Sequence, residues 1–136
     1  MARQKTILIV EDSAIQRMQV KKALQGAAEY RLLEAQNGGD GFAMARDNPE
    51  INLFILDYNM PEMNGFQMLE RVRAVTTHTH TPAVMLTTEV HKQFRTEAKK
   101  LGVTAWIVKP FLPESLLLVV DKTFKGVSFS RTEFKV

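Results

Sequence analysis

The 136-residue chain contains no cysteine, which excludes disulfide bonds and any metal site built on thiolates. It also has no apolar run near the roughly 20 residues that a membrane-spanning helix needs, so no membrane insertion is expected. The N-terminus, Met1 to Lys5, leads straight into a strand-like segment without the apolar core of a signal peptide. We therefore expect a cytoplasmic protein, and its length corresponds to one soluble globular domain.

A strong excess of one charge is also missing, because 18 lysines and arginines face 15 aspartates and glutamates. The basic residues are scattered, apart from small groups such as Lys21–Lys22 and Lys99–Lys100, which we interpret as solvated helix faces. A nucleic-acid-binding domain would need a basic stripe on one face, so we expect no direct contact with nucleic acid.

Five strand-like runs alternate with five helix-like segments along the chain. The expected strands cover residues 7–10, 30–35, 52–56, 83–86 and 104–108. This alternation predicts an α/β protein with a parallel sheet and right-handed crossovers. Five strands suit the flavodoxin-like, doubly wound (βα)5 fold with strand order 2-1-3-4-5, in which ligands bind at the carboxyl ends of the strands.

The helix-like segments have recognisable ends and apolar faces. The first is expected from Ser13 to about Gln25, with Ser13 or Asp12 as N-cap and Gly26 as the stop. The last begins near Pro113, and its apolar run is too long to face inward throughout, so Leu118 or Val119 is expected at the surface. In the third and fourth helices, the residues expected to face inward are Phe66, Leu69, Val72 and Val75, then Val90, Phe94, Ala98 and Leu101.

Residues that can carry chemistry follow four of these strands. Glu11 and Asp12 follow the first strand, Asp57 the third, Thr87 the fourth and Lys109 the fifth. Taken singly, each has an ordinary interpretation, such as a surface acid, a helix cap or a solvated lysine. Together they predict one site, because carboxyl ends of parallel strands meet at one edge.

Such an acid cluster calls for a cation. Two carboxylates about 4 Å apart repel by roughly 4 kcal/mol at an effective dielectric constant near 20. Oxygen-only ligands favour a hard ion, and few protein carboxylates completed by water and phosphate describe Mg²⁺ better than Ca²⁺.

With these motifs, the chain resembles the receiver domain of two-component response regulators. The resemblance covers about residues 4–124 and leaves 125–136 as a C-terminal extension without an output domain. It implies a single-domain regulator, not an enzyme acting on other substrates, with chemotaxis-type signalling as the expected role. The matching motifs are Glu11-Asp12, Asp57, Met60 to Gly65, Thr87 and Lys109-Pro110-Phe111.

The resemblance implies a role for each matching residue. Asp57 would accept a phosphoryl group from a sensor histidine kinase, with Lys109 bridging to Asp57 or its phosphate. Mg²⁺ would be held by Glu11, Asp12, Asp57 and the backbone carbonyl of Asn59.

Four positions would govern switching and rate. Thr87 and Trp106 would move when Asp57 is phosphorylated, and Asn59 and Glu89 would influence dephosphorylation. The family usually has tyrosine or phenylalanine at the position of Trp106, and a small residue at that of Thr88, so switch balance and phosphoryl access are open at these positions.

The resemblance also implies a cis peptide bond between Lys109 and Pro110. The face formed by the fourth helix, last strand and last helix would bind a downstream target, the flagellar motor or another effector, as a monomer or a phosphorylation-dependent dimer. Phe129 and Phe134, in the extension, could pack on the domain or on a second chain.

Two other functions compete with this interpretation. One is a phosphorelay intermediate that passes its phosphoryl group to a histidine phosphotransfer protein. The other is a haloacid-dehalogenase-type phosphohydrolase, which would need an aspartate as general acid where this chain has Asn59.

Overall fold

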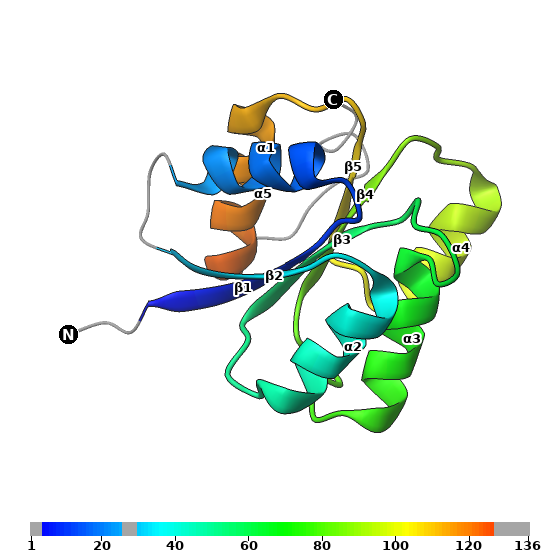
Figure 1. Cartoon of the computed structure of the whole chain (residues 1–136). Helices are drawn as coiled ribbons and strands as arrows, with labels where there is room; N and C mark the ends of the chain where they lie inside the picture. Colours follow the sequence, from blue (N-terminus) through cyan, green and yellow to red (C-terminus); the bar gives the residue numbers. More distant parts are fainter. Residues whose placement is uncertain (1–3, 26–29, 127–136) are drawn as a thin grey trace.

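A computed structural model of the chain describes residues 4–25 and 30–126. It contains one parallel five-stranded sheet in the order β2-β1-β3-β4-β5, so the predicted fold class is confirmed (Figure 1). The strands are β1 Lys5–Val10, β2 Tyr30–Ala35, β3 Leu53–Asp57, β4 Ala83–Thr87 and β5 Ala105–Val108. The helices are α1 Ala14–Leu24, α2 Gly38–Asp47, α3 Gly65–Val75, α4 Lys92–Lys100 and α5 Pro113–Phe124.

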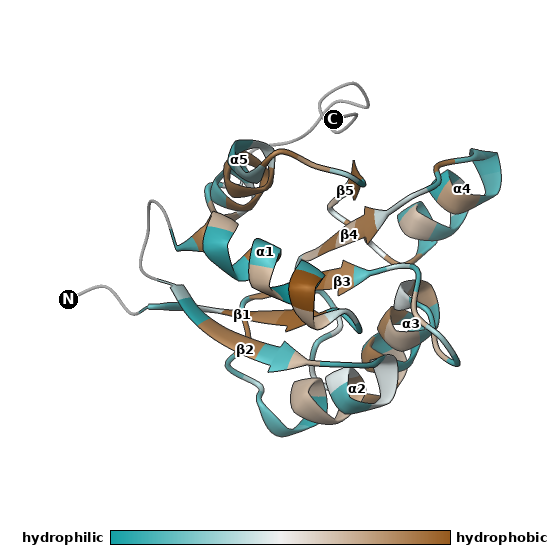
Figure 2. Cartoon of the chain, turned by 45° about the horizontal axis from the view of Figure 1, so that its top comes forward, coloured by the Kyte–Doolittle hydropathy of each residue, from teal (hydrophilic) through white to brown (hydrophobic). Residues whose placement is uncertain are grey.

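Helices cover both faces of the sheet. Helices α1 and α5 pack on one face, and α2, α3 and α4 on the other (Figures 1 and 2). Strands β3 and β4 are therefore buried along their whole length, which explains why their sequences are apolar without alternation. The edge strands β2 and β5 are only partly buried.

The strand register decides which residues meet at the carboxyl edge. Val10 pairs with Leu56 across β1 and β3, so the next residues, Glu11 and Asp57, become neighbours. On the other side of β3, Asp57 itself pairs with Leu86 of β4. Thr87 pairs with Val108, which brings Lys109 to the same edge.

Local hydrogen bonds fix the helix ends near this edge. The Ser13 side chain accepts from the backbone N–H of Gln16 and caps α1. Asn64 and Gln67 form a reciprocal capping box at the start of α3. Pro113 occupies the first turn of α5, as predicted. The predicted stop at Gly26 lies outside the described residues.

The structure corrects two details of the predicted helix faces. Val75, predicted to face inward, is 64% exposed, because it is the last residue of α3 and the chain turns away there. Val90 packs partly against the core but precedes α4, since His91 caps that helix by accepting from the Phe94 N–H. On α5, Leu118 is the surface residue, with 53% exposure, and Val119 is buried.

Arg73 of α3 forms a hydrogen bond with the C-terminal end of α4. Its guanidinium donates to the carbonyl of Leu101, the C-cap of α4, at 3.1 Å. It also donates to the carbonyl of His78, before β4, at 3.0 Å. Arg73 thus links the C-terminal end of α4 to α3 and, through a second bond, to the segment before β4.

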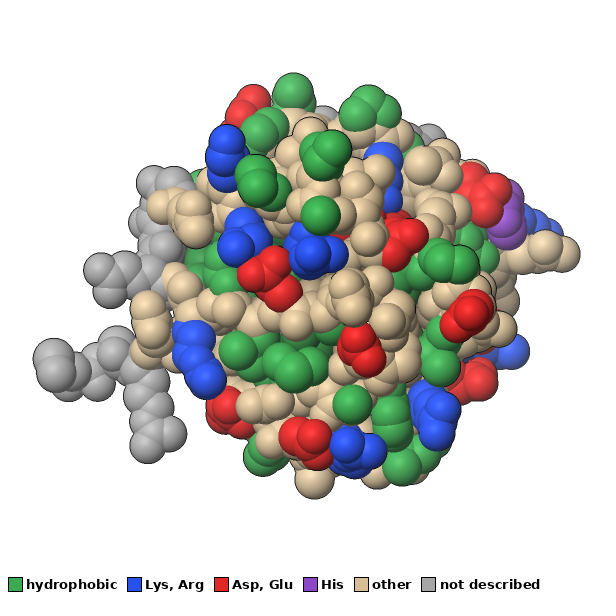
Figure 3. All heavy atoms as spheres, in the orientation of Figure 1, with side chains coloured by type: hydrophobic (Ala, Val, Ile, Leu, Met, Phe, Trp, Pro, Cys, Tyr) green, Lys and Arg blue, Asp and Glu red, His purple; other side chains and the backbone are tan. Residues whose placement is uncertain are grey.

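Helix α5 ends at Phe124, and Lys125 and Gly126 complete its last turn. Phe129 and Phe134 lie outside the described residues. Within the described residues, the helices are too short or too polar to cross a bilayer. On the face shown in Figure 3, basic side chains are interspersed with acidic ones and form no basic stripe.

Candidate functional site

Three carboxylates converge at the carboxyl edge of the sheet, as the sequence predicts. Glu11 and Asp57 are each 1% exposed, whereas Asp12 is exposed to solvent. One carboxylate oxygen from each of the three lies within 4.8 Å of the others. The cluster thus has a buried floor and an open side.

The acid cluster is electrostatically costly. Burial raises the pKa of Glu11 to about 7, and the nearby Asp57 carboxylate adds to that increase. The backbone N–H of Ser13, which donates to Glu11 at 3.1 Å, and the charge of Lys109 act in the opposite direction. Removing carboxylates from water disfavours their charged form, whereas a nearby positive charge favours it. A bound cation would therefore offset the cost of burying these carboxylates.

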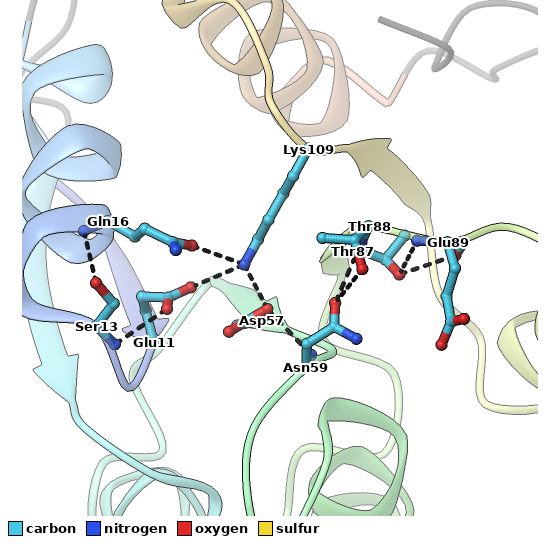
Figure 4. A network of polar contacts seen from close by, with 9 residues as sticks. All are labelled: Glu11, Ser13, Gln16, Asp57, Asn59, Thr87, Thr88, Glu89 and Lys109. Atoms are coloured by element: carbon cyan, nitrogen blue, oxygen red, sulfur yellow. Dashed lines mark hydrogen bonds and ion pairs between the residues drawn. The ribbon is translucent and has the colours of Figure 1, made fainter.

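Lys109 supplies part of that positive charge. Its Nζ donates to Asp57 Oδ1 at 2.7 Å and to Glu11 Oε2 at 3.4 Å, and its side chain is 13% exposed (Figure 4). A third bond, to Gln16 Oε1 at 2.8 Å, holds the ammonium from the first turn of α1. The sequence prediction did not include Gln16, whose only signal is its place just after the Ser13 cap.

Asn59 is bonded at two points. Its backbone N–H donates to Asp57 Oδ1 at 3.1 Å. Its side-chain Oδ1 accepts from the backbone N–H of Thr88 at 3.1 Å and from the Thr88 hydroxyl at 3.2 Å (Figure 4). Asn59 therefore connects the loop after β3 with the loop after β4.

Thr87 is fully buried, and its hydroxyl bonds within its own loop. It donates to the carbonyl of Glu89 at 2.8 Å and accepts from the Glu89 N–H at 3.2 Å. The exposed side chain of Glu89 points away from Asp57 (Figure 4). Thr87 thus lies beside the cluster without a hydrogen bond to Asp57 among the described residues.

Trp106 lies on the edge strand β5, opposite Met85 of β4, and is half-buried. Its ring meets that of Phe94 on α4 edge to face, with centroids 5.9 Å apart. The Lys109–Pro110 peptide bond, which follows this strand, is cis.

The donor set fits the predicted metal. Glu11, Asp12 and Asp57 offer only oxygen, and one lysine leaves an excess of negative charge. The exposed side at Asp12 leaves room for water and a phosphoryl oxygen to complete the coordination. Few carboxylates plus retained water are typical of Mg²⁺.

Comparison with known families identifies the same kind of domain. A sequence model described as "Response regulator receiver domain" matches residues 7–121. The chain is 37% identical over 110 residues to the "Chemotaxis protein CheY homolog" of Campylobacter jejuni, a match that covers 81% of this chain and 85% of that protein. It is 32% identical over 122 residues to the "Chemotaxis protein CheY" of Pseudomonas aeruginosa, covering 90% and 98% respectively.

Solved structures of similar proteins share this fold. The chemotaxis response regulator CheY4 of Vibrio cholerae superposes with a TM-score of 0.79 at 37% identity, covering 88% of this chain and 98% of that one. A CheY-like receiver domain protein from Methanospirillum hungatei gives 0.81 at 26% identity, covering 91% and 96%.

Proposed function

The chain belongs to the response regulator receiver domain family, and from this premise we propose that Asp57 is its phosphoacceptor. The observation that carries the proposal is the contact of Lys109 with Asp57 at 2.7 Å, inside a cluster of three acids. The phosphoryl donor is a sensor histidine kinase. Since the relatives are named chemotaxis proteins, we assign the signal to a chemotaxis-type pathway.

The proposed transfer is an in-line displacement. Asp57 Oδ1 already accepts from Lys109 and Asn59, so Oδ2 is the attacking oxygen. A bond forms from Oδ2 to phosphorus, the phosphorus–nitrogen bond of phosphohistidine breaks, and its electron pair stays on the donor's imidazole. Lys109 stabilises charge on the transferred oxygens. Mg²⁺ held by Glu11, Asp12, Asp57 and the Asn59 carbonyl would neutralise further charge.

The added phosphoryl group gives Thr87 a new bonding partner. Its hydroxyl leaves the Glu89 backbone and donates to the phosphoryl group, which vacates space beside β5 for Trp106. A bias of a few kcal/mol suffices to shift such an equilibrium between two states.

This change alters the face built from α4, β5 and α5, which binds the protein target. Half-buried Trp106 and exposed Leu118 lie on these elements and offer apolar surface to a protein target. Pull-down with the phosphate mimic beryllofluoride, compared with untreated protein, identifies the target.

The assignment is tested by labelling with acetyl phosphate and Mg²⁺, followed by intact mass measurement. Asp57→Ala is expected to abolish the added phosphoryl group, whereas Asp47→Asn, on the exposed end of α2, keeps it. Persistent labelling of Asp57→Ala would refute the assignment. Phosphotransfer profiling against purified kinases then identifies the kinase. Rapid transfer of the phosphoryl group to a histidine phosphotransfer protein would indicate a phosphorelay intermediate instead.

A further inference from the structure

The Asn59 side chain occupies two hydrogen-bond donors next to the proposed phosphoacceptor. The backbone N–H and the hydroxyl of Thr88 both donate to Asn59 Oδ1, at 3.1 and 3.2 Å. The backbone N–H of Asn59 simultaneously donates to Asp57 Oδ1 at 3.1 Å. Figure 4 shows the carboxamide lying between Asp57 and Thr88.

This arrangement lies on the solvent side of the site. Asp57 is buried, whereas Asn59 and Thr88 are both exposed. A phosphoryl group that approaches Asp57 from solvent therefore meets the loops that these two residues join. While the bond persists, the Thr88 N–H is already used and is not free for an incoming anionic oxygen.

We propose that Thr88 is a positioning residue whose hydroxyl holds the Asn59 carboxamide across the entrance to Asp57. This hydrogen bond, called the hold below, must break before Asp57 can be phosphorylated. The inference rests on the proposed function and adds a residue that sets the rate of phosphoryl uptake. Thr88 acts through Asn59 and does not contact the transferred phosphorus.

If the hydroxyl of Thr88 limits access, its substitutions should rank differently than if side-chain bulk limits access, and three substitutions separate the two cases. Serine keeps the hydroxyl and loses the methyl group, valine keeps the branched shape and loses the hydroxyl, and alanine loses both. Loss of the single bond from the Thr88 hydroxyl is expected to make opening about threefold faster.

The experiment measures the rate constant of Asp57 phosphorylation by acetyl phosphate in Mg²⁺, followed by Trp106 emission and intact mass. Thr88→Val and Thr88→Ala are expected to react about threefold faster than the parent protein, and Thr88→Ser at the parent rate. If alanine and serine are fast and valine equals the parent, side-chain bulk governs access and the proposal is wrong. Equal rates for all four also overturn it.

A second measurement tests the partner of Thr88. In an Asn59→Ala background, the carboxamide is absent, so Thr88→Val should no longer change the rate. A threefold effect that survives there refutes the hold. Mg²⁺ affinity, measured by isothermal titration calorimetry, should be equal in Thr88→Val and the parent. A changed affinity would mean that the substitution acts through the metal cluster, which would refute the hold.

These results also separate this inference from the function on which it rests. Parent protein labelled on Asp57, but with rates in the wrong order, refutes the role of Thr88 alone. Parent protein that takes no phosphoryl group on Asp57 refutes both.

Discussion

At the scale of single residues, the three acids of the site differ in how their charge is balanced. Asp57 and Glu11 are buried and share the ammonium of Lys109. Asp12 is exposed and forms no ion pair among the described residues, although it lies in the same cluster. Without a cation, Asp12 therefore contributes repulsion and little else.

This difference predicts opposite effects of Asp12→Asn with and without metal. In EDTA the variant is expected to be as stable as the parent or up to about 1 kcal/mol more stable, because one repulsive charge is gone. In Mg²⁺ it should lose most of the metal's stabilisation, which is about 2.7 kcal/mol when Mg²⁺ is at 100 times its Kd. Thermal unfolding in both conditions measures this.

Glu70→Gln provides the matched control, since Glu70 is an exposed acid of α3 outside the cluster. It should respond to Mg²⁺ as the parent protein does. An Asp12→Asn variant that retains the full shift in unfolding temperature would show that Asp12 is not a ligand.

Single residues also show what the sequence can and cannot predict. Asp57 and Lys109 were predictable neighbours, because each ends or follows an apolar strand and parallel strands share an edge. The bonds of Gln16 to Lys109 and of Thr88 to Asn59 were not predicted. They depend on side-chain directions in loops and first helical turns, which have no repeating pattern.

At the scale of elements, α3 approaches the backbone of Asp57 very closely. A Cβ atom added at Gly65 would lie 2.8 Å from the carbonyl oxygen of Asp57 and 2.5 Å from Met85 Sδ. Gly65 is the first residue of α3, so the start of this helix lies directly against the end of β3. Only glycine leaves the room for this contact.

Gly65→Ala is therefore expected to destabilise the fold by about 1–3 kcal/mol, the usual cost of overpacking. It should also slow Asp57 labelling, because the backbone that carries Asp57 has to move. Gly39→Ala on α2 is the control, since its Cβ would meet only Asn37 Oδ1 at 3.4 Å. Urea unfolding of both variants measures the effect, and equal midpoints would contradict the packing argument.

Helix existence was predictable from apolar spacing, but helix ends were not fully so. Val90 has the spacing of a helical residue, yet the His91 cap starts α4 after it. Val75 continues the apolar stripe of α3 beyond the point where a neighbour covers it. Spacing identifies a face, whereas caps and the facing element decide where that face ends.

At the scale of the whole molecule, two apolar clusters share a single sheet. One lies between the sheet and α2, α3 and α4, and the other between the sheet and α1 and α5. Because alternate residues of β1 and β3 belong to opposite clusters, neither cluster can dissolve while the other stays intact.

We therefore expect a single cooperative unfolding transition. Trp106 is the only tryptophan and packs against the first cluster, whereas far-ultraviolet circular dichroism reports all helices. The two signals should give the same urea midpoint, as two-state unfolding requires. An earlier midpoint for Trp106 emission would show that the α4 side unfolds separately.

The Arg73 bonds to Leu101 and His78 hold the C-terminal end of α4 in place, so this end is the fixed point of the helix. Its other end follows the short segment that starts at Thr88. A shift of that segment would rotate α4 about Arg73 instead of translating it, so displacement would be largest at the N-terminal end of the helix. A rotation of this kind needs no long chain of moving residues.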